Sequence, residues 1–267
     1  MSLQAQQNES GRGAADGFFR LLPVRAEPFP HVVKDDWLEP ELYCALESSF
    51  PICPPGSGPA GHNLFWGDEG YRRLLDDSPE WRALFDRFHN QQFVDWALAQ
   101  FEPVFREETA LDLEGARYVP WCENREQKQQ PALRPPAGAS PLDLWVRMDL
   151  LQGRVGYGRE AHLDHRRRAV SLLIYFCGGE REGGDLVLHG RDGGARLVEP
   201  RRNRMVVFPC HRESLHSVTP IEHQSGPRNF VQVTLSGWQD LWTSEPRVAA
   251  GGAWLGAARN AARRLFA

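Results

Sequence analysis

The N-terminal third of the chain places its hydrophobic residues at helical spacing. A first helix is expected after Leu38, because apolar residues return every three or four positions and Pro40 can occupy the first turn. A stronger helix is expected after Ser78, a residue type that caps helices, with Pro79 at the first helical position. This helix should run, with or without a break, to about Gln100. Its apolar face would consist of Trp81, Leu84, Phe85 and Phe88.

The pattern changes after residue 120. Residues 120–141 are polar and rich in proline, which is typical of a loop or linker. Between residues 142 and 238, short runs of β-forming residues alternate with glycine-containing turns; the runs are 144–151, 169–176, 185–188, 204–208 and 229–235. This spacing favours an antiparallel sandwich, barrel or jelly roll over βαβ units.

These segments predict one domain with a tail at each end. Residues 1–27, which begin with a polar Gly-, Ser- and Gln-rich stretch, are predicted to be a disordered tail. The domain would comprise residues 28–245, and residues 246–267 would form a C-terminal helix or tail. Within the domain we expect helical support over 28–119, a loop or substrate lid over 120–141 and a β core over 142–238.

Composition and charge exclude several classes of protein. The chain has 267 residues, of which 41% are hydrophobic, so it can bury a full core and is not intrinsically disordered. A net charge of −4 does not fit a nucleic-acid-binding protein. There is no run of about 18 apolar residues and no secretory signal pattern, so we expect a cytoplasmic protein that does not bind membranes. The five cysteines are scattered, without a Cys-x-x-Cys pair, which predicts free thiols; the oligomeric state is left open.

Candidate chemistry begins with a histidine close to a carboxylate. In an extended segment, His162 and Asp164 point to the same side and could hold one metal ion. With nine histidines and 35 acidic residues, about one His-x-Asp/Glu pair is expected by chance, and the chain has a second, His211 and Glu213. The surrounding sequence must therefore decide, and it favours the first pair, because Arg212 and the lack of a following strand make the second fit a solvated turn.

A third ligand and a cationic residue lie further along. His216 follows an apolar strand, and a sheet that folds back could bring it beside His162. Two histidines and one carboxylate leave coordination positions open on Fe(II). Arg228 opens the next strand and would suit a bidentate clamp on a carboxylate. This set indicates a metal together with an anionic co-substrate.

The order of these motifs resembles a known superfamily. The motifs are His162-x-Asp164, Arg168-Ala-Val-Ser-Leu-Leu-Ile-Tyr175-Phe, Glu182-Gly-Gly-Asp-Leu, His216-Ser-Val-x-Pro and Arg228. Together they resemble the Fe(II)- and 2-oxoglutarate-dependent oxygenases, most closely the prolyl-hydroxylase-type branch. The stretch from Pro28 to Phe50-Pro also looks like the opening of many bacterial members. The likeness spans roughly residues 28–238.

The resemblance implies a fold, a site and an activity. It implies a mainly β protein with a helical N-terminal layer, built on a double-stranded β-helix (jelly roll). Iron would be bound by His162, Asp164 and His216, while Arg228 and Tyr175 would bind the distal carboxylate of 2-oxoglutarate. The cofactors implied are Fe(II), 2-oxoglutarate and O2, with ascorbate as an optional addition. An aspartate at position 164, where halogenases have a small residue, favours hydroxylation.

The substrate is left open by the sequence. We expect hydroxylation of an unactivated C–H bond in a small molecule, with decarboxylation of 2-oxoglutarate to succinate and CO2, because no separate peptide-recognition module is visible. A peptidyl (prolyl-type) hydroxylase and a non-catalytic cupin-like binding protein are the alternatives. Arg147 and Arg159 are candidates to line a substrate channel, and the basic run 166–168 could attract an anionic substrate, although a solvated turn explains that run more simply.

Two features depart from the family pattern. Arg228 lies a few residues further from His216 than is usual, so a longer turn must be accommodated. Gln152 stands where a tyrosine often precedes the first histidine, which puts one co-substrate contact in doubt.

His165 adjoins the motif but should point away from the metal in an extended segment.

Overall fold

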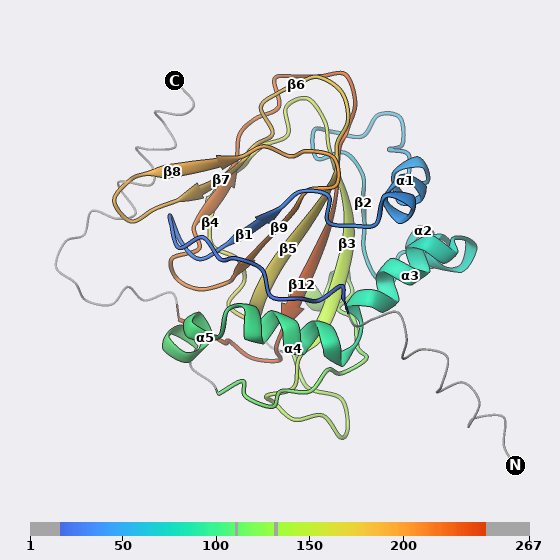
Figure 1. Ribbon diagram of the computed structural model, residues 1–267. Coiled ribbons are helices and arrows are strands. Elements are labelled where there is room, and N and C mark those ends of the chain that lie inside the picture. The colour runs from blue at the N-terminus through green and yellow to red at the C-terminus, as the bar shows by residue number, and fades with distance from the viewer. Residues whose placement is uncertain (1–16, 110–111, 131–132, 244–267) are drawn as a thin grey trace, which may run out of the picture.

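Two antiparallel sheets form the centre of the protein (Figure 1). The computed structural model describes residues 17–109, 112–130 and 133–243. The larger sheet has the order β1 (Val32–Lys34), β9 (Met205–Pro209), β5 (Arg168–Phe176), β12 (Arg228–Ser236), β3 (Trp145–Gly153) and β2 (Asn63–Leu64). The smaller sheet has the order β4 (Arg159–His162), β10 (His216–Val218), β7 (Leu186–His189) and β8 (Ala195–Val198). The short strands β6 (Arg181–Glu182) and β11 (His223–Gln224) pair with each other.

The path of the chain makes these sheets a double-stranded β-helix. Strands β3, β5, β9 and β12 lie in the larger sheet, and β4, β7, β8 and β10 lie in the smaller one, so the chain crosses repeatedly between them. All pairings within both sheets are antiparallel. The predicted mainly β jelly roll is therefore confirmed.

One face of the larger sheet looks toward the smaller sheet. Phe208 of β9 contacts His216 of β10, with 5.0 Å between ring centroids. The register pairs Phe208 with Ser171, Ser171 with Thr234 and Thr234 with Arg147. Because cross-strand partners point to the same side, these side chains share the inner face, together with every second residue along each strand.

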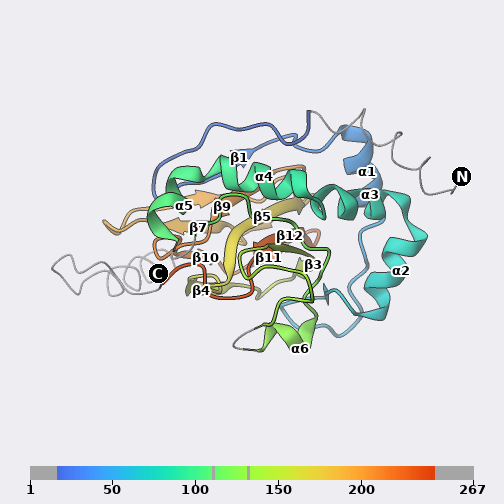
Figure 2. The ribbon, with the colours of Figure 1, turned by 90° about the horizontal axis from the view of Figure 1, so that it is seen from below.

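The opposite face of the larger sheet is apolar and is covered by helices. Phe176 stacks on Tyr43 of α1 (Pro40–Ser48), with 5.1 Å between centroids, and lies 6.1 Å from Trp81 of α3 (Pro79–Phe88). Figure 2 shows α3 and α4 (Gln91–Gln100) on the side of the sheet away from β4 and β10. The remaining helices are α2 (Glu69–Asp77), α5 (Glu102–Glu108) and α6 (Arg125–Lys128). Within the described ranges, none of the helices has the length and apolar character needed to cross a bilayer.

The helix that the sequence places after Ser78 is present and is broken in two. The Ser78 hydroxyl accepts a hydrogen bond from the backbone N–H of Trp81 at 3.3 Å, which makes it the predicted N-cap. The first helix ends at Phe88, and Asn90 caps the next by accepting from the N–H of Phe93 at 3.1 Å. The capping side chain of Asn90 explains why the helix restarts.

The predicted tail over residues 1–27 is wrong for its second part. Phe18 packs on Trp37, with 4.5 Å between centroids, and Phe19 packs on Trp96 at 5.4 Å. The rings anchor this segment, which continues with Leu21 and Leu22, to the helical layer. Residues 1–16 and the predicted C-terminal element over 246–267 lie outside the described residues.

Candidate metal centre

Three predicted ligands converge at one edge of the smaller sheet. His162 ends β4 and pairs directly with His216, the first residue of β10. Asp164 lies two residues beyond His162. One ligand atom from each of the three residues lies within 4.8 Å of the other two. The pairing of β4 with β10 thus brings together residues that are distant in the sequence.

Backbone contacts fix the orientation of both imidazoles. Nδ1 of His162 lies 2.8 Å from the carbonyl oxygen of Glu160, and Nδ1 of His216 lies 2.9 Å from that of Ser214. A carbonyl only accepts, so each Nδ1 carries the proton and each Nε2 keeps a lone pair for a metal. Burial lowers the pKa of His162, and it lowers that of His216 to about 4. Both rings are therefore neutral near pH 7, as ligation requires.

Asp164 is held in its charged form. Burial by itself raises the pKa of this carboxyl, but the positive charge of Arg168, which forms an ion pair with Oδ1, outweighs burial with help from the two histidines. The net result is a pKa well below the usual range. The thiol of Cys210 donates to Oδ2 at 3.5 Å. A buried carboxylate beside two neutral imidazoles is the donor set that suits Fe(II).

Arg228 is buried with only neutral partners. It is 1% exposed, and its Nε donates to the carbonyl oxygen of Gly184 at 2.7 Å. Its Nη2 donates to the hydroxyl of Tyr175 at 3.4 Å, and its Nη1 has no hydrogen-bond partner. No salt bridge to Arg228 occurs within the described part of the chain. A buried guanidinium in this state is suited to a carboxylate from outside the protein.

Tyr175 and Phe230 form the walls around that guanidinium. Its central carbon lies 5.1 Å from the Tyr175 ring centroid and 4.6 Å from that of Phe230. Burial raises the pKa of Tyr175 to about 12, so the hydroxyl stays neutral and can donate to an anion. The structure thus brings both predicted co-substrate residues to one place on the inner face.

The remaining sequence candidates lie elsewhere. Gln152 donates to the carbonyl oxygen of Pro51 and to Asn229 Oδ1, at 2.8 and 2.9 Å, on the helix-covered face of the sheet. Glu213 pairs with Arg191 and does not join His211 in any group of possible metal ligands among the described residues. The solvated turn predicted for this pair is wrong for His211, which is buried at 3% exposure.

Sequence reasoning missed a network of buried charges on the inner face. It named Arg147 only as a candidate for a channel, whereas Arg147 donates to Asp149 Oδ2 at 2.8 Å and forms an ion pair with Glu123. Arg167 contacts the other oxygen of Glu123 at 3.2 Å. The available signal was the pair of charges two positions apart in an apolar strand, which places both on one face.

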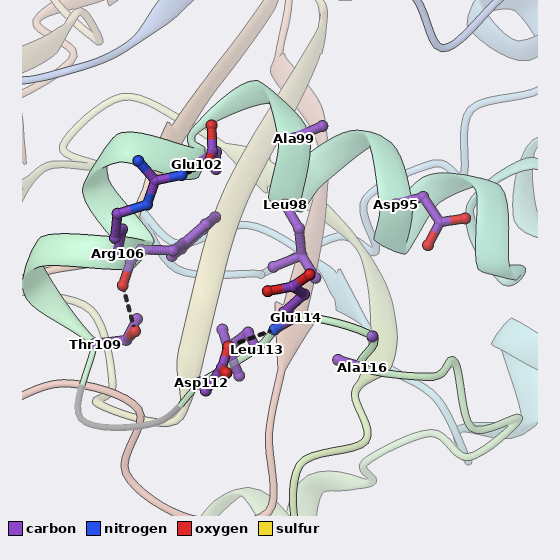
Figure 3. Close-up of a pocket in the computed structure, with 12 residues that line it drawn as sticks. Asp95, Leu98, Ala99, Glu102, Arg106, Thr109, Asp112, Leu113, Glu114 and Ala116 are labelled. Atoms are coloured by element: carbon purple, nitrogen blue, oxygen red, sulfur yellow. Dashed lines mark hydrogen bonds and ion pairs between the residues drawn. The ribbon is translucent and has the colours of Figure 1, made fainter.

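Two hollows accompany these residues. A cavity of about 140 Å³ lies beside the buried charges and includes Arg168, the partner of Asp164. A larger cleft of about 800 Å³ lies between α4, α5 and residues 112–116 (Figure 3). Acidic side chains such as Glu102 and Asp112 line the cleft, and it contains none of the predicted site residues. Of these two hollows, the small cavity lies nearer to the candidate metal centre, because Arg168 lines it and pairs with Asp164.

Comparison with known proteins identifies the region that contains the site. Residues 148–239 match the model of the 2OG-Fe(II) oxygenase superfamily, and this range includes all three candidate ligands, Tyr175 and Arg228. The resemblance seen in the sequence is thereby confirmed. No match was found among curated proteins.

Similar solved structures include several prolyl hydroxylases. One is a prolyl 4-hydroxylase from Phytophthora capsici, with 18% identity, coverage of 88% of this chain and 68% of that chain, and a TM-score of 0.49. Another is a prolyl-4-hydroxylase from Pseudomonas putida (17%, 78% and 92%, TM-score 0.42). A third is a prolyl hydroxylase from Trichoplax adhaerens in complex with a hypoxia inducible factor peptide fragment (12%, 78% and 83%, TM-score 0.43). Likenesses this distant leave the substrate open.

Proposed function

Because residues 148–239 belong to the 2OG-Fe(II) oxygenase superfamily, we propose that this protein is an Fe(II)- and 2-oxoglutarate-dependent dioxygenase that hydroxylates a small molecule. One observation carries the proposal: a largely buried set of two neutral imidazoles and a carboxylate occurs on the same jelly roll as a buried arginine that has no anionic partner among the described residues. The first would hold the metal, and the second would hold the co-substrate.

His162, Asp164 and His216 would hold the metal ion. Bound Fe(II) would supply the activation of O2 that oxidises the C–H bond, coupled to decarboxylation of 2-oxoglutarate to succinate and CO2. The protein's part is to present both Nε2 atoms in the correct tautomer through the carbonyls of Glu160 and Ser214. Arg168 keeps the carboxylate of Asp164 charged and limits its rotation.

Arg228 and Tyr175 would bind the distal carboxylate of 2-oxoglutarate. The free Nη1 of Arg228 supplies a donor that has no acceptor in the protein, and the Tyr175 hydroxyl adds a second donor beside it. A carboxylate here would neutralise a buried charge, so binding removes an electrostatic cost that the protein carries alone. This position fits the co-substrate despite the longer turn before Arg228.

A small-molecule substrate is supported by the size of the connected cavity. About 140 Å³ has room for a few heavy atoms, since one water in the liquid takes up about 30 Å³. Hydroxylation is favoured over halogenation because Asp164 takes the position that a halide ligand would need. Peptidyl hydroxylation and non-catalytic ligand binding are the outcomes against which the proposal is tested.

The first experiment tests the metal and the co-substrate together. Anaerobic titration of the apoprotein with Fe(II) and 2-oxoglutarate should produce a visible metal-to-ligand charge-transfer band. His162→Ala should abolish the band, whereas His223→Ala should leave it unchanged, because His223 is exposed on β11. Absence of the band in the natural protein, or its survival in His162→Ala, would exclude the proposed centre.

The second experiment tests the substrate class. Succinate formation from 2-oxoglutarate is measured with a panel of amino acids, sugars and proline-containing peptides. Stimulation by small molecules supports the proposal, and stimulation by peptides alone would make the protein a peptidyl hydroxylase. A normal charge-transfer band without succinate formation under any condition would indicate a binding protein.

A further inference from the structure

The cavity of about 140 Å³ lies between the inner face of the larger sheet and the segment 123–129. Arg147 of β3 and Ser236 of β12 belong to the sheet side, and Lys128 of α6 belongs to the segment. Arg168 connects the cavity to the candidate metal centre, because the same guanidinium lines the cavity and pairs with Asp164. A molecule in this cavity is therefore one side chain away from a metal ligand.

Positive charge exceeds negative charge around this cavity. Four cationic side chains line it: Lys128, Arg147, Arg167 and Arg168. Three carboxylates form ion pairs with these arginines: Glu123, Asp149 and Asp164. The balance leaves one positive charge, which a single anionic group would neutralise.

Two of the cationic groups have donors without acceptors. Arg147 is 2% exposed, yet its Nη2 has no hydrogen-bond partner. Lys128 makes no salt bridge with any residue that the structure describes, and its Nζ lies 4.8 Å from the centroid of the Phe65 ring. Burial and the neighbouring charges of Arg147 and Arg168 lower the pKa of Lys128 to about 8, against the opposing effect of Asp149 and Glu123. The buried, unpaired Nη2 of Arg147 indicates a missing acceptor, and the half-buried ammonium of Lys128 adds a positive charge beside it.

We propose that this cavity recognises an anionic group of the primary substrate, a carboxylate or a phosphate, through Arg147 and Lys128. The inference rests on the proposed function, because it assigns the anion to the molecule that is oxidised. The cavity volume suits such a group with a short stem, and the unpaired Nη2 of Arg147 can donate to one of its oxygens while Lys128 contributes a positive charge. Glu123 already places a carboxylate against Arg147 and Arg167, so this cluster accepts that chemistry. The substrate's anion would thus orient it beside Asp164.

Binding of simple anions tests the cavity without turnover. The probes are sodium acetate and sodium phosphate, added to the apoprotein at constant ionic strength, and the signal is the fluorescence of tryptophan, because Trp145 lines the cavity. Lys128→Gln should weaken binding by about fivefold or more, as expected for a hydrogen bond to a charged group. The matched control is Lys34→Gln, since Lys34 is the other lysine of the chain and does not line the cavity. Equal binding by the two variants would overturn the proposal.

A second variant should shift affinity in the opposite direction. Glu123→Gln removes a carboxylate that competes for Arg147, so anion affinity should rise severalfold. A merely damaged protein would lose affinity in both variants, and that result would count against the inference. The preferred probe identifies the chemistry: stronger binding of acetate indicates a carboxylate substrate, and stronger binding of phosphate indicates a phosphorylated one. Acetate binding that persists in Lys128→Gln and disappears in Arg228→Met belongs to the co-substrate site and would also overturn the assignment.

The charge-transfer band distinguishes failure of the anion-site proposal from failure of the oxygenase proposal. If the band forms normally and Lys128→Gln binds anions like the control, only the cavity assignment fails. If anions bind in the predicted way but the band is absent, the cavity stands as an anion site and the oxygenase proposal fails. Once the panel yields a substrate, its carboxamide or dephosphorylated analogue should stimulate succinate formation at least about tenfold less.

Discussion

The larger sheet has a buried arginine near each end of its inner face, and the two arginines differ in their charged partners. Arg228 and Arg147 are 1% and 2% exposed. Arg147 lies between two carboxylates, those of Asp149 and Glu123. Arg228 contacts a carbonyl, a phenol and two aromatic rings but no carboxylate among the described residues. The positive charge of Arg147 is thus neutralised by carboxylates of the protein, whereas we propose that the charge of Arg228 is neutralised by a bound ligand.

The two arginines differ in how much of their charge the protein itself neutralises: Arg147 pairs with two carboxylates and keeps only Nη2 unpaired, whereas Arg228 pairs with no carboxylate among the described residues. A buried ion that lacks a partner costs several kcal/mol of folding free energy, so an uncompensated Arg228 is maintained at the expense of stability. A compensated Arg147 keeps Glu123, and with it the segment that closes the small cavity, in a fixed position. We propose that both ends serve recognition, and the Arg147 end is held by protein carboxylates before any ligand binds.

The largest expected effect is a loss of stability when Arg147 is replaced. Arg147→Met leaves the carboxylates of Asp149 and Glu123 buried without their main partner, so the free energy of unfolding should fall by about 3–5 kcal/mol. Urea denaturation followed by circular dichroism measures the change. Arg166→Met is the matched control, because its ion pair with Asp240 is half exposed and should contribute less than about 1 kcal/mol. Equal stability of the two variants would show that the buried network contributes nothing.

The second-largest expected effect is a loss of 2-oxoglutarate affinity when Arg228 is replaced. Arg228→Met should weaken 2-oxoglutarate binding by about 100-fold, because it removes the charged partner of the buried carboxylate. Without 2-oxoglutarate, the free energy of unfolding should be unchanged or higher, since an apolar side chain replaces an unpaired charge. Calorimetric titration and urea denaturation measure the two quantities. A loss of stability as large as that of Arg147→Met would contradict the distinction between the two ends.

A smaller effect should come from the phenol beside Arg228. Tyr175→Phe removes one neutral donor and should weaken 2-oxoglutarate binding by about three- to tenfold, while Fe(II) binding is unchanged. Tyr43→Phe is the matched control, because the Tyr43 ring stacks on the helix-covered face. The same affinity in both variants would remove Tyr175 from the co-substrate site.

The smallest effect is a difference in pH dependence between the two ends. Lys128 has a pKa of about 8 in the folded protein, against 10.5 as the ordinary value, so the unfolded chain binds more protons between these pH values. The free energy of unfolding of the apoprotein should therefore rise as the pH goes from 8 to 10.5. The charges around Lys128 are Arg147, Arg168, Asp149 and Glu123.

Anion binding in the cavity should weaken over the same interval, as Lys128 loses its proton. Binding of 2-oxoglutarate at Arg228 should not follow this trend, because Arg228 does not line the cavity that contains Lys128. Titrations with acetate and with 2-oxoglutarate at pH 7 and 9 compare the two ends. The comparison fails if Lys128→Gln keeps the full pH dependence of acetate binding.

Much of the fold and the candidate site could be predicted because local chemistry determined them. Ser78 and Pro79 marked a helix start, and alternation with glycine turns marked the strands. The ordered motifs identified His162, Asp164, His216, Tyr175 and Arg228, which the structure places in two groups on one jelly roll.

Other features depend on contacts that a sequence does not display. The break before α4 rests on the capping side chain of Asn90, within a pattern that is otherwise continuous. Phe18 and Phe19 directly follow the polar residues 1–16, and their place in the core becomes evident only from their packing on Trp37 and Trp96. The partner of Arg147 comes from a proline-rich segment whose sequence gives no sign that Glu123 is buried.

The pairing of His162 with His216 also determines when the centre can form during folding. The two residues belong to strands separated in sequence by the five strands β5 to β9, and they become neighbours only when β10 pairs with β4. Such non-local pairings form late, because the long loop between them must first be closed. A centre that uses all three proposed ligands can therefore form only after β10 has paired with β4.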